Sequence, residues 1–286
     1  MPDRTAQLRA FFARYVVAAG RARDPAIGRA FATVRREPFA GPGPWSIHVI
    51  GAGYIETPND DPAFLYQDTL VALDAARGIN IGQPSAHAHW LDALALKPAE
   101  SVIQVGAGTG YYTTILTHLV GPTGRVRAYE IDAGLAARAQ ENLRPLPQAS
   151  VVARSGLGDD LPDADAIYVC AGIAQPARSW LDALRPGGRL VFPLQAVGAL
   201  GGMLMIRCPA QGGIWPAHFI SSAAFIACEG PQDAEINRRL AEAFARGEAR
   251  TVRSFRTDRP IDATCWFAAE DWWLSTTDPA PVAASP

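Results

Sequence analysis

Three alternate glycines form the strongest chemical signal in the sequence. Residues 101–105 are apolar, Gly106, Gly108 and Gly110 follow in a G-x-G-x-G spacing, and a helical pattern begins at Tyr111. Glycines at a turn from strand to helix let a ligand lie against the main chain, because a Cβ atom would obstruct it. The spacing therefore predicts a cofactor at the carboxyl end of a strand.

The end of this loop separates two classes of cofactor. A dinucleotide site needs G-x-G-x-x-G/A, with a small last residue and a pyrophosphate on the helix N-terminus. Here Tyr111 holds that last position, and the third glycine comes one residue early at Gly110. The loop therefore favours a ligand without a pyrophosphate, such as S-adenosylmethionine.

An acidic residue beyond the loop supports the same cofactor. Glu130 ends the second expected strand, where a carboxylate accepts hydrogen bonds from ribose hydroxyls. The expected cofactor contacts are the loop, the acid with its neighbour, and a later pair: Gly106, Ala107, Gly108, Thr109, Gly110, Tyr111, Glu130, Ile131, Ser155 and Gly156. The alternative is that the loop belongs to an α/β domain that binds no cofactor and that Glu130 is a solvated carboxylate at a strand end.

Strands and helices alternate around this loop, which predicts an α/β fold with a mainly parallel sheet covered on both faces. Strands are expected at residues 101–105, 126–129, 151–153, 166–169 and 190–192, and helices at 111–120, 133–143 and 180–184. Two further strands, at 203–207 and 218–228, are joined by a turn at Gly212 and Gly213. No helix separates them, so we expect an antiparallel hairpin that closes the sheet.

The two ends of the chain carry different patterns. Residues 5–34 are expected to be helical, because Leu8, Phe11, Phe12, Tyr15 and Val16 recur at helical spacing, whereas the Gly- and Pro-rich residues 38–54 predict loop. Near the other end we expect a helix at 233–246 capped by Gly247, an aromatic strand at 265–274 and a frayed tail at 279–286. Three segments follow: an N-terminal helical and loop segment (1–100), a Rossmann-like domain (101–230) and a C-terminal helix–strand extension (231–286).

Composition bounds the class of protein. Of 286 residues, 49% are hydrophobic and 19% charged, and the formal net charge of -2 gives no general attraction to nucleic acid. The four cysteines form no CxxC pair, which favours free thiols in a reducing compartment. Arginines interrupt the first apolar stretch and no segment suits a membrane span, so we expect a cytoplasmic protein. Oligomeric state leaves no trace in the sequence.

Several segments together resemble the protein-L-isoaspartate O-methyltransferase family. The glycine loop with the following residues 111–126, and residues 165–169, resemble its cofactor motif and fourth strand, while residues 184–190 resemble a motif of class I methyltransferases. Upstream, residues 34–39, 66–68 and 80–84 resemble the family's V-P-R-E-x-F, Y-x-D and T-I-S-Q-P. The resemblance covers about residues 30–230.

This resemblance implies a fold and a reaction. The implied fold is a Rossmann-like sheet with an antiparallel closing hairpin. The implied enzyme is an O-methyltransferase that moves a methyl group from S-adenosylmethionine to the carboxylate of an isoaspartyl residue, which begins the repair of damaged protein. The expected partner is a protein or peptide that bears a carboxylate, or a small acid, and neither nucleic acid nor a membrane.

The chain departs from the family pattern at two positions. Gly82 stands where the family has a serine close to the substrate carboxylate, and Ser155 stands where it has an acid that meets the adenine. These departures leave open a methyltransferase for another acceptor, such as a small molecule or modified peptide, and a non-catalytic protein that binds the cofactor.

A second group of residues is expected to hold the acceptor. Pro84 suits the first turn of a helix through Leu91 and Leu94, and the free N–H groups of that turn favour an anion. The candidate catalytic positions are Gly82, Ser85, His87 and Asp68, with Tyr66 beside them. Ser85 could supply the missing hydroxyl, and His87 matches a histidine of some family members. Their alternatives are a surface serine, a packed helix histidine and, for Asp68, loop capping.

No metal site is expected. His87 and His89 lie two residues apart on a helix, so their side chains face different directions. A carboxylate acceptor is already a nucleophile at neutral pH and needs no general base. The protein would therefore supply alignment and exclude water.

Overall fold

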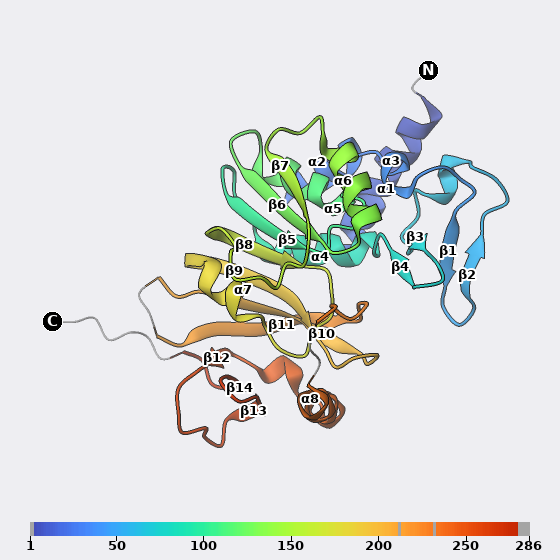
Figure 1. The fold of residues 1–286 in the computed structure, drawn as a ribbon. Helices are drawn as coiled ribbons and strands as arrows, with labels where there is room; N and C mark the ends of the chain where they lie inside the picture. Colours follow the sequence, from blue (N-terminus) through green and yellow to red (C-terminus); the bar gives the residue numbers. More distant parts are fainter. Residues whose placement is uncertain (1–2, 211–212, 231–232, 280–286) are drawn as a thin grey trace. The chain divides into compact units, whose positions relative to one another are not determined.

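Figure 1 shows the fold in a computed structural model, which describes residues 3–210, 213–230 and 233–279. By its contacts the chain divides after Gly156 into two compact units. The division into three segments that the sequence suggests stays a prediction.

The first unit contains three parallel strands that carry the glycine loop. Strands β5 (Ser101–Val105), β6 (Arg125–Glu130) and β7 (Ala149–Ala153) lie side by side in that order. Helices α5 (Tyr111–Val120) and α6 (Ala133–Leu143) connect them and pack on the strands. The strand β5 and both helices have the predicted bounds. The parallel order brings the carboxyl ends of β5 and β6 to one edge, where the glycine loop and Glu130 lie.

The expected helical segment near the N-terminus is two helices. Helix α1 (Arg4–Gly20) ends where Arg21 adopts a left-handed conformation (φ 52°), and α2 (Pro25–Thr33) begins after the N-cap Asp24. Both pack with α4 (Pro84–Leu94), the helix predicted to begin at Pro84. Only part of the apolar pattern faces the core: Phe12 and Val16 are buried, while Phe11 is 60% exposed and Tyr15 51%.

The prediction of loop at residues 38–54 is wrong. This stretch enters a short helix α3 (Glu37–Ala40) and forms a hairpin of β1 (Ser46–Val49) and β2 (Gly53–Glu56). The tight turn needs glycine at positions 51 and 53, whose φ values are 82° and 78°. Glycine and proline content thus marked the turns correctly, but it concealed two four-residue strands.

A second small hairpin separates this region from α4. After a single 3-10 turn η1 (Pro62–Phe64), strands β3 (Ala72–Asp74) and β4 (Ile79–Asn80) pair in antiparallel fashion. Its base is closed by the hydrogen bond from Ile81 N–H to Val71 O, 2.9 Å long. This hairpin was not predicted from the sequence.

The second unit contains parallel and antiparallel pairs. Strand β8 (Ala164–Val169) runs parallel to β9 (Leu184–Leu194), and α7 (Arg178–Ala183) precedes β9. Strand β9 pairs antiparallel with β10 (Gly201–Arg207), which pairs antiparallel with β11 (Trp215–Ala223). The predicted hairpin is therefore confirmed, although Gly212 of its expected turn lies outside the described residues.

The C-terminal extension continues this antiparallel order. Strand β12 (Ser254–Arg256) pairs with β11 and with β14 (Trp273–Ser275), and β13 (Cys265–Ala268) pairs with β14. The single strand expected at residues 265–274 is thus two strands, and β12 was not expected. Helix α8 (Ala234–Arg246) has the predicted C-cap Gly247, and a 3-10 turn η2 (Ala249–Thr251) follows. The predicted tail lies beyond Pro279, outside the described residues.

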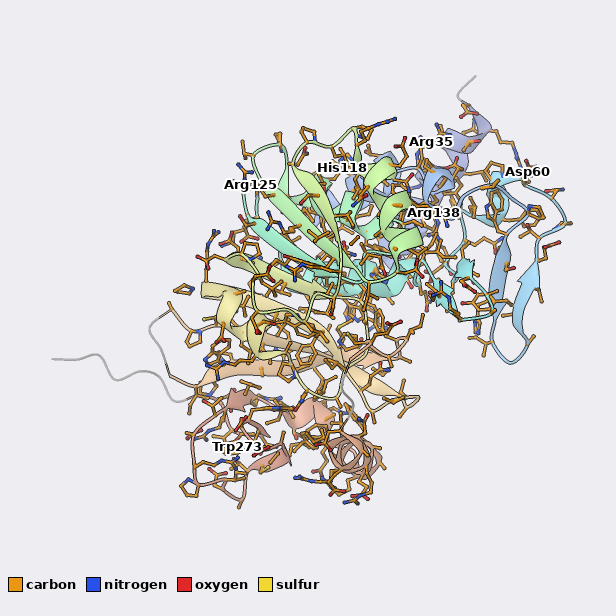
Figure 2. The ribbon with its side chains drawn as sticks, viewed as in Figure 1. Arg35, Asp60, His118, Arg125, Arg138 and Trp273 are labelled. Atoms are coloured by element: carbon orange, nitrogen blue, oxygen red, sulfur yellow. The ribbon has the colours of Figure 1, made fainter. Side chains whose placement is uncertain are left out.

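Aromatic side chains form the core of this extension. Phe219, Phe244 and Trp266 pack edge to face, with ring centroids 5.2–5.5 Å apart. Trp273, labelled in Figure 2, is buried, and the Arg256 guanidinium lies 4.6 Å from the centre of its ring. These contacts explain why a polar, amphipathic helix and three short strands form a stable structure here.

Other expectations can be compared with the described part of the chain. No helix there has the length and apolar character needed to cross a bilayer. The four cysteines are free thiols. Among residues 3–210, 213–230 and 233–279, no three His, Cys, Asp or Glu side chains gather into a metal site.

Candidate functional site

The glycine loop is held against the neighbouring strand by its own main chain. Gly106, Gly108 and Gly110 have φ values of 80°, 55° and 92°, in the left-handed region that favours glycine. The N–H groups of Gly106 and Ala107 both donate to Tyr129 O of β6, at 2.9 and 3.2 Å. The loop is therefore a fixed turn between β5 and α5.

The glycines of the site serve different purposes. A Cβ atom at Gly110 would lie 3.3 Å from Leu143 of α6, and one at Gly156 would lie 2.8 Å from Val105. These two glycines permit close packing of the protein itself. At Gly108 a Cβ atom would approach only a methyl group of Leu73, at 3.3 Å.

Glu130 lies beside the loop, as predicted. Its carboxylate is 7% exposed and accepts hydrogen bonds from Gly108 N–H (2.7 Å) and Asp132 N–H (3.0 Å), one on each oxygen. Burial raises the pKa of this carboxyl group, and the two N–H donors partly offset the effect. A carboxylate has about four acceptor positions, so it retains capacity for the two hydroxyls of a ribose.

The side chains of the loop face the protein. Thr109 Oγ1 donates to Phe39 O at 2.8 Å, and the ring of Tyr111 packs edge to face with Phe31 and Phe39. Arg138 of α6 also donates to Phe39 O, at 3.2 Å (Figure 2). The side chains of Thr109 and Tyr111 are therefore engaged by the protein itself.

Three expected cofactor residues beside β6 differ in exposure. Ile131, directly after Glu130, is 47% exposed. Ser155 is partly buried and precedes the buried Gly156. As a whole, the set of cofactor-binding residues stays a prediction.

Gly82 and His87 meet at the start of α4. Gly82 has φ +87°, and a Cβ atom there would lie 2.3 Å from His87 Nε2. The imidazole thus occupies the space that a side chain at position 82 would need. Tyr112, from the helix that follows the glycine loop, stacks on this imidazole with ring centroids 3.6 Å apart.

His87 is uncharged in this setting. The ring is 2% exposed, and burial lowers its pKa to about 3, with a further contribution from the positive charge of Arg36. A neutral imidazole at physiological pH cannot act as a cation for an anionic acceptor.

Asp68 and Ser85 form the other half of this corner. Ser85 N–H and Ser85 Oγ donate to the two oxygens of Asp68, at 2.7 and 2.6 Å. The expectation that the first turn of α4 offers free N–H groups to an anion is wrong for Ser85, because Asp68 already fills that role. Gln83 Nε2 donates to Asp68 as well, at 3.2 Å. The four candidate positions thus meet in two pairs, Asp68 with Ser85 and Gly82 with His87.

Arg36 also lies in this region, and it was not among the predicted site residues. It is completely buried, with its guanidinium carbon 5.2 Å from the ring centres of both Phe12 and Tyr111. Within the described residues, its side-chain nitrogens donate to no acceptor. Cation–π contacts therefore stabilise this charge, and its position in the motif at residues 34–39 was the only signal in the sequence.

Known proteins share sequence and fold with this chain. The model of the family described as Protein-L-isoaspartate(D-aspartate) O-methyltransferase matches residues 54–207, more than half of the chain. A solved protein-L-isoaspartate O-methyltransferase has a TM-score of 0.63 at 20% identity, covering 88% of this chain and 73% of that one. A Plasmodium falciparum β-aspartate methyltransferase, in complex with S-adenosyl-L-homocysteine, has a TM-score of 0.60 at 19% identity, covering 77% of this chain and 98% of that one. These neighbours show the Rossmann-like fold of class I methyltransferases.

Curated relatives carry the same family name. The protein-L-isoaspartate O-methyltransferase of Ignicoccus hospitalis is 34% identical over 46% of this chain and 63% of its own length. The Aeropyrum pernix protein is 33% identical over 49% of this chain and 55% of its own, so the chain spans less than two thirds of these two relatives. The Geotalea uraniireducens protein-L-isoaspartate O-methyltransferase 1 is 31% identical over 65% of this chain and 76% of its own length. The chain therefore belongs to the protein-L-isoaspartate O-methyltransferase family.

Proposed function

We propose that this protein transfers a methyl group from S-adenosylmethionine to the carboxylate of an isoaspartyl residue in a protein or peptide. The observation that carries the proposal is the buried Glu130 carboxylate, bonded to Gly108 N–H at 2.7 Å at the edge of a fixed glycine loop. Relatives named for this reaction, and a fold neighbour in complex with S-adenosyl-L-homocysteine, support it.

The residues of the first unit fit such a cofactor. The main chain at Gly106 and Gly108 would lie against it, and Glu130 would accept bonds from its ribose hydroxyls. When bound, S-adenosylmethionine supplies an electrophilic methyl group. The chain orients the acceptor and excludes water, because a carboxylate attacks without a general base.

The corner around Gly82 supports an acceptor that brings its own negative charge. Burial lowers the pKa of His87 to about 3, so its imidazole is a weak base, and Asp68 is occupied by Ser85 and Gln83. Neither residue is arranged to remove a proton from a neutral acceptor. This arrangement favours a carboxylate over an alcohol or amine as the methyl acceptor.

A transfer assay tests the proposal. Protein incubated with S-adenosylmethionine radiolabelled in its methyl group should form a base-labile ester on an isoaspartyl peptide and none on the aspartyl peptide of the same sequence. Intact cofactor binding without any ester would instead indicate another acceptor, such as a small acid or a modified peptide. Lack of cofactor binding would remove the enzyme proposal altogether.

Calorimetric titration with S-adenosylmethionine examines the cofactor side. We expect Glu130→Ala to weaken binding at least about tenfold, since hydrogen bonds to a charged group contribute about 1.5–3 kcal/mol each. Glu141→Ala is the matched control, because Glu141 is an exposed acid on α6 that pairs with Arg144 at 2.8 Å. Equal affinities of the two variants would contradict the role of Glu130.

A further inference from the structure

The β3–β4 hairpin contacts the glycine loop through Leu73. A methyl group of Leu73 lies 3.3 Å from the position that a Cβ atom of Gly108 would take. Leu73 itself is partly buried, so part of this apolar side chain remains accessible above the loop. An apolar side chain in that position can cover a ligand that lies on the glycine main chain.

The turn of the same hairpin contacts Asp132, two residues after Glu130. Arg77 Nη2 lies 2.8 Å from Asp132 Oδ2, and Arg77 Nε donates to Asp74 at 2.6 Å. Asp132 also caps α6 through Leu135 N–H at 2.9 Å. The guanidinium thus joins the tip of the hairpin to the start of the helix that follows Glu130.

These two contacts lie on either side of the predicted ribose acceptor. Glu130 bonds Gly108 N–H with one oxygen and Asp132 N–H with the other. Leu73 meets the first of these residues and Arg77 pairs with the second. The hairpin therefore spans the carboxylate that is expected to hold the cofactor.

The base of the hairpin differs from its tip. Val71 is completely buried and accepts from Ile81 N–H, and it also pairs with Ile47 of β1. Residues 75–77 are exposed. Among the ion pairs of the described chain, Arg77–Asp132 is the one that joins this tip to another element. Loss of the pair would remove the link between the tip and the start of α6 while the base stays folded.

We propose that Leu73 and Arg77 are cofactor-positioning residues, with Leu73 as the apolar cover of the glycine loop and the Arg77–Asp132 ion pair as the latch that holds it there. The inference rests on the proposed function, because it concerns the same cofactor. It assigns to this chain a determinant of how long S-adenosylmethionine stays bound.

The test measures dissociation of radiolabelled S-adenosylmethionine during a chase with S-adenosylhomocysteine. Arg77→Ala and Asp132→Asn should each raise the dissociation rate constant about two- to fivefold, the range for an exposed ion pair of a few tenths to one kcal/mol. Asparagine still caps a helix, so Asp132→Asn removes the charge and keeps α6 intact. The double variant should dissociate no faster than the single variants, because both remove one interaction.

Salt and a control variant sharpen the test. Raising NaCl from about 0.1 M to about 1 M should speed dissociation from the unmodified protein more than from Arg77→Ala, because salt screens exposed charges. Arg144→Ala is the matched control, since Arg144 pairs with Glu141 at 2.8 Å elsewhere on α6. Leu73→Ala should weaken equilibrium binding without changing the salt dependence.

The possible failures are distinguishable. If Arg77→Ala and Arg144→Ala release the cofactor at the same rate, or the double variant is additive, the latch is wrong while the proposed function stands. If the unmodified protein does not bind S-adenosylmethionine, both the function and the latch are overturned. If Arg77→Ala lowers the unfolding midpoint below that of Arg144→Ala, dissociation is compared at a temperature where both variants are fully folded.

Discussion

At the scale of single residues, a side chain at position 82 requires a smaller residue at position 87. Gly82→Ser would restore the family residue, but its Cβ would lie 2.3 Å from His87 Nε2 and its φ is +87°. We expect a loss of about 2–5 kcal/mol of stability, the sum of overpacking and a left-handed conformation. Urea unfolding measures this loss of stability. In the double variant with Gly82→Ser and His87→Ala, the part of the loss that comes from overpacking should disappear.

A second glycine separates these two causes. Gly51 has φ +82°, and a Cβ atom there would meet nothing within 4 Å. Gly51→Ser should therefore lose only the conformational part, about 1–2 kcal/mol. Equal losses for the two serine variants would show that the imidazole does not exclude a side chain at position 82.

The same histidine predicts how stability depends on pH. Burial lowers the pKa of His87 to about 3 in the folded protein, below the value of about 6.5 in an unfolded chain. The unfolded state then binds the extra proton between these values, so stability is full above about pH 6.5 and falls as the pH decreases toward 3. At about pH 5 the loss from this residue is about 2 kcal/mol. His87→Gln should remove that part of the difference between urea unfolding at pH 5 and at pH 7.5, and an unchanged difference would contradict it.

At the scale of elements, the cap of α4 connects stability with the acceptor site. Asp68 accepts from both Ser85 N–H and Ser85 Oγ. Asp68→Ala should lower the free energy of unfolding by about 0.5–2 kcal/mol, as loss of a helix cap does. Because the turn after Gly82 loosens with it, the KM for an isoaspartyl peptide should also rise.

The control for this prediction is a cap that lies on another helix. Asp24 caps α2 by accepting from Ala26 N–H at 2.8 Å. Asp24→Ala should lower stability by a similar amount and leave the KM unchanged. A KM that rises equally in both variants would show that the effect comes from general loosening rather than from Asp68.

Elements whose signals are local were predictable from sequence. Helices α5 and α6 match their expected ranges because apolar periodicity and terminal residues such as Asp132 and Gly121 mark them. The β1–β2 hairpin was missed because its four-residue strands depend on pairing with each other and on the Ile47–Val71 bridge. The site divides in the same way: the loop and Glu130 are read from contiguous sequence, whereas the stacking of Tyr112 on His87 and the burial of Arg36 arise only when separate helices pack.

At the scale of the whole molecule, the C-terminal extension lies outside the residues that the family model matches, as residues 1–53 do. The family model ends at residue 207, but regular structure continues through α8 to β14. Its aromatic core joins β11 to the extension, since Phe219 of β11 contacts Phe244 of α8 and Trp266 of β13. We infer that the extension folds together with β11 and is not an appended tail.

Trp266→Ala tests this inference. Trp266 is 7% exposed, contacts Phe219 and Phe244, and donates from Nε1 to Gly247 O at 2.9 Å. Truncating such a buried aromatic residue should lower the free energy of unfolding by about 3–5 kcal/mol. Phe11→Ala, at a side chain that is 60% exposed, should change it by less than about 0.5 kcal/mol. Calorimetry distinguishes the outcomes. If Trp266→Ala only separates a small early unfolding transition and leaves the main transition in place, the extension unfolds on its own and the inference is wrong. If the transition that includes β11 moves to a lower temperature, the aromatic core holds the second unit together.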